Sequence, residues 1–318
     1  MLHSAHRHAI LLGAMPGEDF LGGPYSAHTN MKQVFLIQAH KDPSQLNALV
    51  EQLRDDDFLI YVNLDRKCDI DPAVVSPHAR LVRERIDVHW GSFSQVQAVL
   101  HSLTQIVAEV PAFDKVVFLS AQDFPLLSNA RLKAELARLR GHELLDSVAI
   151  GPAPGQWAAN YRYQYFCADH AATPLRLACG AANVLLRVTG RRRRLPGGMR
   201  PYGGSSWWAM SRECVTALLA RIQEEPRLLR FFRTVTCPDE LFFQTLVMNS
   251  RFAGRVLGHN FRYIEWPAQG ARNPKVLDED DFDRIAASHA HFCRKIDSRA
   301  SAGLVPRLLA LRRVDTDG

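Results

Sequence analysis

Between residues 33 and 141, short apolar runs alternate with longer amphipathic segments. Apolar runs of strand length without polar alternation are typical of parallel strands that are buried on both faces. Segments with an apolar residue at every third or fourth position are typical of helices that pack on a sheet. The alternation therefore predicts an α/β fold with a mostly parallel sheet between layers of helices. The predicted strands are 33–39, 58–65, 79–84 and 115–121, and the predicted helices are 42–54, 92–110 and 129–141.

The second half of the chain is less regular. Residues 142–204 mix aromatic residues, Gly, Pro and Arg with little periodicity. After them, SSWWAMS (205–211) predicts a short strand and RECVTALLARIQ (212–223) predicts a helix. A further helix is predicted in DELFFQTLVMNS (239–250), where two acids precede an apolar helical run.

The chain has 318 residues, 47% of them hydrophobic, which is enough for a large core. Residues 1–30 lack periodicity and are rich in Gly, His and Ser, so we expect a disordered N-terminal extension. We expect a single domain over 31–300, followed by a basic amphipathic tail over 301–318 that either docks on the domain or contacts an anionic membrane. No apolar run approaches the roughly 18 residues that cross a bilayer. A cytoplasmic protein is therefore expected, with peripheral membrane attachment as an option.

The formal net charge is +6, and much of the excess lies in GRRRRLPGGMR (190–200), which contains the arginine run 191–194. This stretch is a solvated loop, a contact to an anionic membrane or acceptor, or a nucleic-acid contact. No aromatic residue is interleaved with the arginines, as nucleic-acid binding would favour. We therefore expect no nucleic-acid partner.

Acidic and aromatic residues follow the predicted strands at the edge where open α/β sheets bind ligands. Asp65 follows the second strand, and Asp123 follows the fourth, as a turn former or a ligand contact. Trp90 precedes Gly91 and the predicted helix cap Ser92. Its ring either stacks on a ligand or packs in the core.

The stretch TCPDELFF (236–243) places two carboxylates at the start of a predicted helix. Thr236 and Asp239 have the spacing of a capping pattern, so Asp239 is interpreted as part of a helix cap. Glu240 is not needed for the cap. Its carboxylate either interacts favourably with the helix dipole at the N-terminus or serves as a catalytic base held on a rigid element.

No metal site is expected from the sequence. The six cysteines are scattered singly, which favours reduced thiols over a zinc site. No Gly-rich phosphate loop, dinucleotide fingerprint or nucleophile elbow is present. A diphosphate bound without metal needs fixed cations, and the candidates are Arg272, Lys275, Arg294 and Lys295.

Seven motifs spread over residues 32–297 occur in an order that resembles one known family. They read AHKDPSQLNALV, IYVNLDRK, VHWGSFSQVQAVL, LSAQDFPLLSN, YGGSSWWAMSREC, CPDELFFQTLVMNS and HFCRKID. Together they resemble the core-2/I-branching enzyme family of β-1,6-N-acetylglucosaminyltransferases and peptide O-xylosyltransferases. Because the chain is shorter and simpler than animal members, it is similar to a bacterial representative.

The resemblance implies a GT-A type glycosyltransferase fold, with a nucleotide-binding α/β half and an acceptor-binding half. It implies transfer of GlcNAc or xylose from a UDP-sugar, with inversion, to a glycan, lipid-linked or peptide acceptor. It also implies that no cofactor or metal is required. The alternative is a non-catalytic protein of the same fold that binds a glycan or a nucleotide.

The resemblance further assigns roles to individual residues. The Glu of the family's Pro-Asp-Glu motif is the general base and falls on Glu240. The Lys and Arg that hold the diphosphate fall on Lys295 and, by spacing, on Arg272. On the donor side, the resemblance implies that Trp90 stacks on uracil, that Asp65 contacts uridine and that the backbone near Ile37 makes a further contact. Candidates for contacting the acceptor or supporting the site are Asp123, Trp207 and Asp239.

Overall fold

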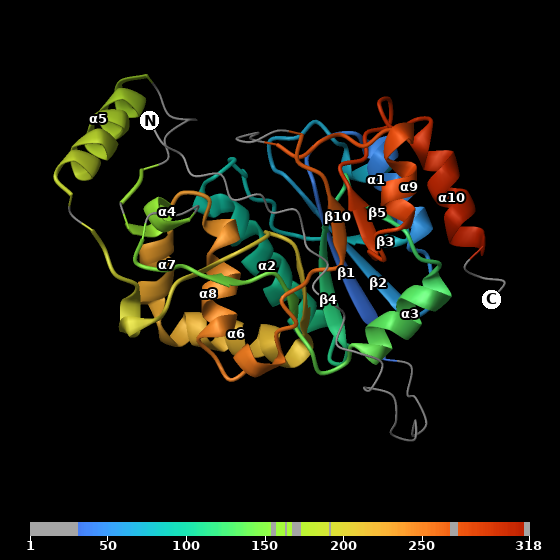
Figure 1. Ribbon diagram of the computed structural model, residues 1–318, viewed down its shortest axis with the longest axis horizontal. Helices are drawn as coiled ribbons and strands as arrows, with labels where there is room; N and C mark the ends of the chain where they lie inside the picture. Colours follow the sequence, from blue (N-terminus) through green and yellow to red (C-terminus); the bar gives the residue numbers. More distant parts are fainter. Residues whose placement is uncertain are drawn as a thin grey trace.

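The computed structural model describes residues 31–153, 157–162, 164–166, 173–190, 192–267 and 273–314, and the predicted extension 1–30 lies outside this part (Figure 1). Within the described part, a six-stranded sheet has the order β3-β2-β1-β4-β9-β6. Strand β1 is parallel to both β2 and β4, while β9 is antiparallel to β4 and to β6. The predicted mostly parallel α/β sheet is confirmed. The strands are β1 Gln33–Ala39, β2 Phe58–Leu64, β3 Ala79–Leu81, β4 Lys115–Ser120, β6 Leu144–Leu145 and β9 Trp208–Ser211.

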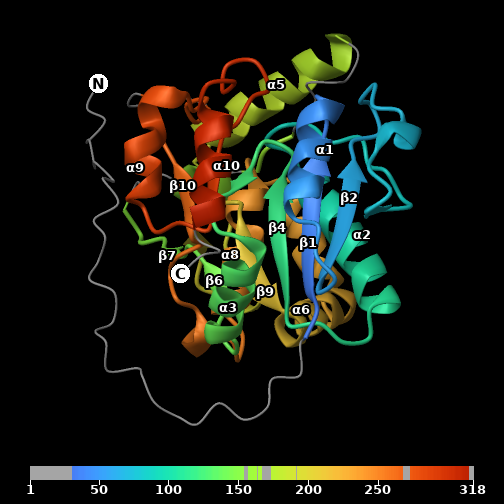
Figure 2. The same cartoon turned by 90° about the vertical axis from the view of Figure 1, so that its right-hand side faces the viewer.

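Two layers of helices cover the sheet because its central strands are apolar on both faces. Along β1, Phe35 and Ile37 join the core beneath α1 and α3, whereas Val34 and Leu36 join the core beneath α2, α6 and α8. Figure 2 shows α1 and α3 in front of the sheet and α2 and α6 behind it. These helices are α1 Pro43–Gln52, α2 Phe93–Glu109, α3 Asn129–Arg138, α6 Arg212–Glu224 and α8 Phe242–Met248.

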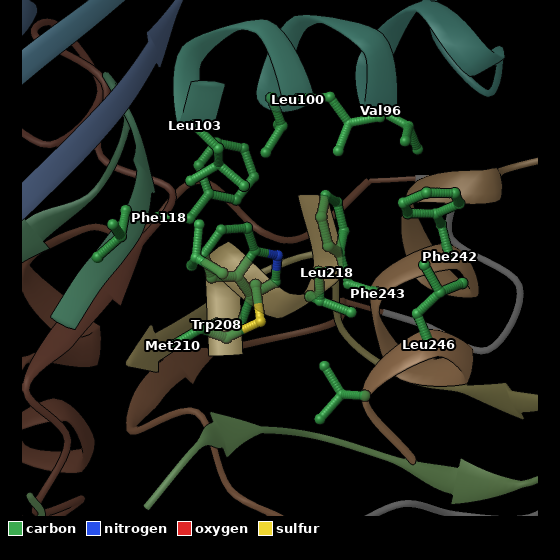
Figure 3. Close-up of a cluster of buried hydrophobic side chains, with 14 of the residues drawn as sticks. Val96, Leu100, Leu103, Phe118, Trp208, Met210, Leu218, Phe242, Phe243 and Leu246 are labelled. Atoms are coloured by element: carbon green, nitrogen blue, oxygen red, sulfur yellow. The ribbon is translucent and has the colours of Figure 1, made fainter. Parts of the chain in front are cut away.

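The larger core fixes α8 against the sheet. Trp208 of β9 is 1% exposed, and its ring centroid lies 5.3 Å from that of Phe118 and 5.1 Å from that of Phe243. Figure 3 shows Trp208 and Met210 between α2 and α8, with Leu103 on the α2 side. This packing holds the start of α8, and with it the turn that carries Glu240, in a defined position.

A smaller sheet and two helices complete the fold at the C-terminal end. Strand β11 (Phe292–Arg294) lies between β10 (Arg262–Ile264) and β5 (Phe124–Pro125). Leu304 and Leu308 of α10 (Leu304–Val314) are fully buried, and Arg312 donates to the Gln52 carbonyl at 2.8 Å. Of the two interpretations of the C-terminal tail, the structure therefore shows the docked one, up to residue 314. Helix α9 (Phe282–Ala286) lies beside α10.

The predicted helix start at Asp239 is wrong in its detail. Residues Pro238–Glu240 form a 3₁₀ turn, and α8 begins only at Phe242. The predicted cap Ser92 is confirmed, since its side chain accepts a backbone N–H of α2, and Asp42 caps α1 in the same way. No helix in the described ranges has the length and apolarity to cross a membrane.

The remaining helices and strands are α4 Ala158–Arg162, α5 Thr173–Val188, α7 Pro226–Phe232, β7 Val148–Ala149 and β8 Tyr202–Gly203.

The arginine run 191–194 is not a uniformly solvated loop. The Arg193 guanidinium donates to the hydroxyl and carbonyl oxygens of Thr234 at 2.7 and 2.8 Å. It also stacks 4.3 Å from the ring centroid of Phe231. Arg193 therefore ties the segment after α5 to α7, while Arg192 and Arg194 are exposed. Arg191 lies outside the described residues.

Candidate active site

The turn that carries Glu240 is held by backbone contacts to the turn at Gly91. Cys237 has a left-handed backbone (φ 47°), and its N–H donates to the Gly91 carbonyl at 2.9 Å. The 3₁₀ turn Pro238–Glu240 follows directly. Its N-cap is Cys237, which makes no side-chain cap, so the predicted cap of Thr236 and Asp239 is wrong.

Asp239 is instead bound to the segment before β9. Its Oδ2 accepts a hydrogen bond from the Ser206 hydroxyl at 2.7 Å. Burial raises the pKa of the Asp239 carboxyl, and the hydrogen bond from Ser206 opposes this. Asp239 therefore supports the turn from the side of Ser206.

The Glu240 carboxylate has one oxygen bound and the other available. The indole Nε1 of Trp157 donates to Oε2 at 2.7 Å, and no residue of the described ranges donates a hydrogen bond to Oε1. Burial raises the pKa of Glu240 to about 7, and the neighbouring charge of Asp239 adds to this, while the Trp157 hydrogen bond opposes it. A carboxylate that titrates near neutral pH with a free oxygen can accept a proton from a bound hydroxyl.

Trp157 was not predicted from the sequence. Its indole lies directly on the backbone of Gly203, where an added Cβ would be 2.5 Å from Cδ2 of the ring. At Gly204 an added Cβ would be 2.0 Å from the carbonyl oxygen of Asp146. The glycine pair therefore permits the close packing that aims Trp157 at Glu240. The only sequence signal was Gly-Gly among scattered aromatic residues.

Trp90 lies beside the Glu240 turn and is exposed. The indole is 65% exposed, so the core-packing interpretation is wrong. The next residue, Gly91, has φ 69°, and a Cβ there would be 3.4 Å from Sγ of Cys237. Trp90 is thus attached to the same pair of turns as Glu240 and can offer its ring as a stacking platform.

Asp65 lies at the carboxyl end of β2 and is 4% exposed. Its carboxylate accepts the N–H groups of Lys67 at 3.1 Å and Val88 at 3.3 Å and the Lys67 ammonium at 2.8 Å. These bonds order the loop after β2 and the segment that leads to Trp90. The structure therefore places Asp65 at the predicted edge of the sheet, as an organiser of that loop.

Lys295 joins this edge from the other side, directly after β11. Its ammonium lies 3.3 Å from Oδ1 of Asn273, and its pKa is lowered by partial burial and by the charges of Arg294 and Lys41. The pKa of His40, at the end of β1, is lowered by partial burial and by Lys41, with smaller effects of Asp65 and Lys295. The ends of β1, β2 and β11 therefore lie near one another, with Lys295 beside the ion pairs Lys41–Asp297 and Lys67–Asp65. Other cations close to a lysine make the binding of an anionic ligand at that lysine more favourable.

Asp123 belongs to a buried ionic group rather than to an open surface. It is fully buried, with Arg262 Nε 2.7 Å from Oδ1 and Arg294 3.6 Å from Oδ2. Its Oδ2 also accepts the backbone N–H of Ser120 at 2.6 Å. Of the two predicted roles, the structure shows the turn former. Arg294 stacks 3.9 Å from the ring centroid of Trp207, so it is not an exposed phosphate cation.

A chain of contacts links the base candidate to the cation candidate. Asp239, next to Glu240, bonds to Ser206, which adjoins Trp207. The Trp207 ring is covered by Arg294, which adjoins Lys295. Trp207, which is partly buried, therefore lies in the framework that connects Glu240 with Lys295.

Two other predicted positions have side chains that are engaged elsewhere, although the Lys295 N–H donates to the Lys275 carbonyl at 3.3 Å. Lys275 is paired with Asp281 at 2.7 Å and with Asp278 at 3.3 Å. Ile37 is fully buried within β1, paired with Val62 on one side and Leu119 on the other. Arg272 lies outside the described residues. In the part of the chain that is described, no three His, Cys, Asp or Glu side chains gather in a way that could hold a metal ion.

Comparisons with known proteins agree with this architecture. The sequence model of the Core-2/I-Branching enzyme family matches residues 34–286. "Xylosyltransferase oxt" of Drosophila pseudoobscura pseudoobscura is 23% identical over 80% of this chain and 30% of that protein. "Xylosyltransferase 1" of Homo sapiens is 24% identical over 89% of this chain and 31% of that protein. "Beta-glucuronosyltransferase GlcAT14B" of Arabidopsis thaliana is 26% identical over 64% of this chain and 45% of that protein. The chain spans about a third of the length of the xylosyltransferases that it matches.

Proposed function

Because this chain belongs to the core-2/I-branching enzyme family, we propose that it is an inverting glycosyltransferase that uses a UDP-sugar donor. The α/β architecture is consistent with a GT-A type fold. The proposed donor sugar is GlcNAc or xylose, and the acceptor is a hydroxyl of a glycan, a lipid-linked precursor or a peptide. The observation that carries the proposal is the Glu240 carboxylate, which has a pKa of about 7, one oxygen fixed by Trp157 and the other without a donor among the described residues.

Inverting transfer needs one base and one stabilised leaving group. The acceptor oxygen attacks the anomeric carbon while the bond from that carbon to the diphosphate oxygen breaks. Glu240 takes the hydroxyl proton, and UDP leaves with the electron pair of the broken bond. A positioned base contributes about 10² to 10⁴-fold to such a step.

The donor contacts are proposed for the edge where β1, β2 and β11 end. Trp90 offers its exposed ring to the uracil, and Asp65 holds the loop beside it. Lys295 supplies positive charge to the diphosphate, together with Arg272 by its spacing in the sequence. With these cations, the proposal assigns no role to a metal ion.

The function is tested by incubating the full chain with a panel of UDP-sugars and measuring UDP release with and without an acceptor mixture. The panel includes UDP-GlcNAc, UDP-xylose and, because of the Arabidopsis relative, UDP-glucuronic acid. Acceptor-stimulated UDP release that persists in EDTA supports the proposal. Saturable binding of a UDP-sugar without turnover on any acceptor would favour the non-catalytic alternative.

The pH dependence of the reaction should report the ionisation of Glu240. A general base acts only when ionised, so kcat/KM should rise with pH to a plateau, with a midpoint of about 7. Trp157→Phe keeps an aromatic ring on Gly203 but removes the N–H that favours the ionised carboxylate. The midpoint should then move up by about one pH unit, since a hydrogen bond to a charged group contributes roughly 1.5 kcal/mol.

The matched control for this variant is Trp266→Phe, because Trp266 is 55% exposed and the indole that donates to Glu240 is that of Trp157. It should leave the midpoint unchanged. A Trp157→Phe profile that superimposes on that of the unmodified protein would show that the indole does not tune the base.

Lys295→Ala should weaken UDP binding by about tenfold while changing uridine binding by less than about twofold, because only UDP carries the diphosphate. Both affinities are measured by titration calorimetry. Lys133→Ala is the control, since Lys133 pairs with Asp55 and Asp57 at the opposite end of β2 from Asp65. Equal losses for UDP and uridine would refute a phosphate role for Lys295.

A further inference from the structure

Helix α5 lies at the edge of the molecule, and none of its side chains is fully buried among the described residues. Figure 1 shows it beyond α4, on the side away from the central sheet. Its apolar side chains are strongly exposed, with Leu177 at 68% and Val188 at 79%. Exposed apolar side chains gathered on one element indicate a contact surface.

One side of α5 faces the protein. The Asn183 side chain accepts the Phe166 N–H at 2.8 Å and donates to the Phe166 carbonyl at 3.1 Å. Partly buried on this side are Cys179 and Leu186, at helical spacing from Asn183, and the adjacent Ala182. At 100° per residue, the opposite side carries an apolar stripe made of Leu177, Val184, Leu185 and Val188.

Positive charge borders this apolar stripe. Arg176 and Arg187 occupy the flank between the inner and outer sides of α5, and both are exposed. Arg192 and Arg194 are exposed in the segment that follows the helix. The sequence contains no Asp or Glu between Asp169 and Glu213, so no acid of this stretch opposes these arginines.

We propose that the outer side of α5 and its flanking arginines bind the surface of an anionic lipid bilayer. An apolar stripe can enter the acyl boundary while arginines on its flank reach the lipid phosphates. With 16 residues, α5 would lie along the interface and not cross it. A second copy of the chain is a poorer occupant, because two arginine-rich surfaces would repel each other.

Binding of the full chain to sedimenting vesicles tests this proposal. The protein should bind vesicles of phosphatidylcholine mixed with phosphatidylglycerol more tightly than vesicles of phosphatidylcholine alone, and added salt should weaken the difference. Leu177→Ser with Leu185→Ser should weaken binding to the anionic vesicles by about tenfold or more, because two inserted apolar side chains are lost. Arg176→Gln with Arg187→Gln should remove most of the preference for the anionic vesicles.

The control is Val74→Ser with Leu257→Ser, because these side chains are 49% and 39% exposed elsewhere on the molecule. It should leave vesicle binding unchanged, as should Glu240→Gln, so this test is independent of the proposed activity. Failure to bind anionic vesicles, or equal losses in the control, would overturn the proposal. A dimer in sedimentation velocity that is lost in Leu177→Ser with Leu185→Ser would assign the stripe to a second copy and likewise overturn it.

Discussion

Replacement of Glu240 by Gln should lower the rate of sugar transfer by about 10² to 10⁴-fold and leave binding of the UDP-sugar within a few-fold. Gln has nearly the shape of Glu and can keep the Trp157 contact by accepting the indole N–H through its amide oxygen. It cannot accept the proton of the attacking hydroxyl. The loss should therefore appear in kcat, as expected when an interaction made only in the transition state is removed.

Single-turnover transfer measured alongside UDP-sugar calorimetry separates the two effects. Glu224→Gln, at an exposed position near the end of α6, is the matched control and should behave as the unmodified protein. Turnover of Glu240→Gln near that of the control would mean that another group accepts the proton. Loss of donor binding together with turnover would mean that Glu240 shapes the donor site instead.

The part of the fold that depends on local pattern could be predicted from the sequence. Strand β1 matches the predicted run 33–39, because the continuous apolar stretch 34–37 is typical of a strand that is buried on both faces. The Ser92 cap follows from a local preference of the backbone. Residues at the carboxyl ends of β1 and β2 lie together as topology requires, and this is why Asp65 lies at the predicted edge.

The part of the site that depends on distant packing could not be predicted in this way. Trp157 and Glu240 are 83 residues apart, and their hydrogen bond exists because Gly203 leaves room for the indole. Asp239 fits a capping pattern, but its carboxylate bonds to Ser206 instead. A side-chain partner from another element can replace a local cap, and local spacing does not reveal such partners.

Adjacent cations provide a second example. Arg294 and Lys295 are equally suitable phosphate ligands by residue type. In the structure, Arg294 turns inward to Trp207 and Asp123, while Lys295 lies with His40 and Lys41. Residue type does not show which of the two side chains faces the site, and only the tertiary structure does.

The buried ionic group around Asp123 should make the largest single contribution of any charged side chain to stability. Asp123→Ala removes the only carboxylate within ion-pair distance of Arg262 and Arg294 among the described residues. Arg262 is 1% exposed at its side chain and Arg294 7%, so neither cation can turn to water. Removing one partner of a buried ion pair costs about 3 to 5 kcal/mol, because a buried charge is left uncompensated. We expect a loss of this size in the free energy of unfolding measured in urea.

Glu213→Ala is the matched control, because Glu213 also binds two arginines, Arg251 at 2.9 Å and Arg255 at 2.8 Å, but does so in solvent. Ion pairs at the surface contribute little to the free energy of unfolding, because both charges are well hydrated without the pair. This variant should therefore lose much less stability than Asp123→Ala. Equal losses would show that the buried group is no more important than the surface one.

Because Arg294 also covers Trp207 beside Lys295, Asp123→Ala should in addition weaken UDP binding at temperatures where the variant remains folded. Weaker UDP binding would show that the ionic group of Asp123 supports the proposed donor site through Arg294 and Trp207.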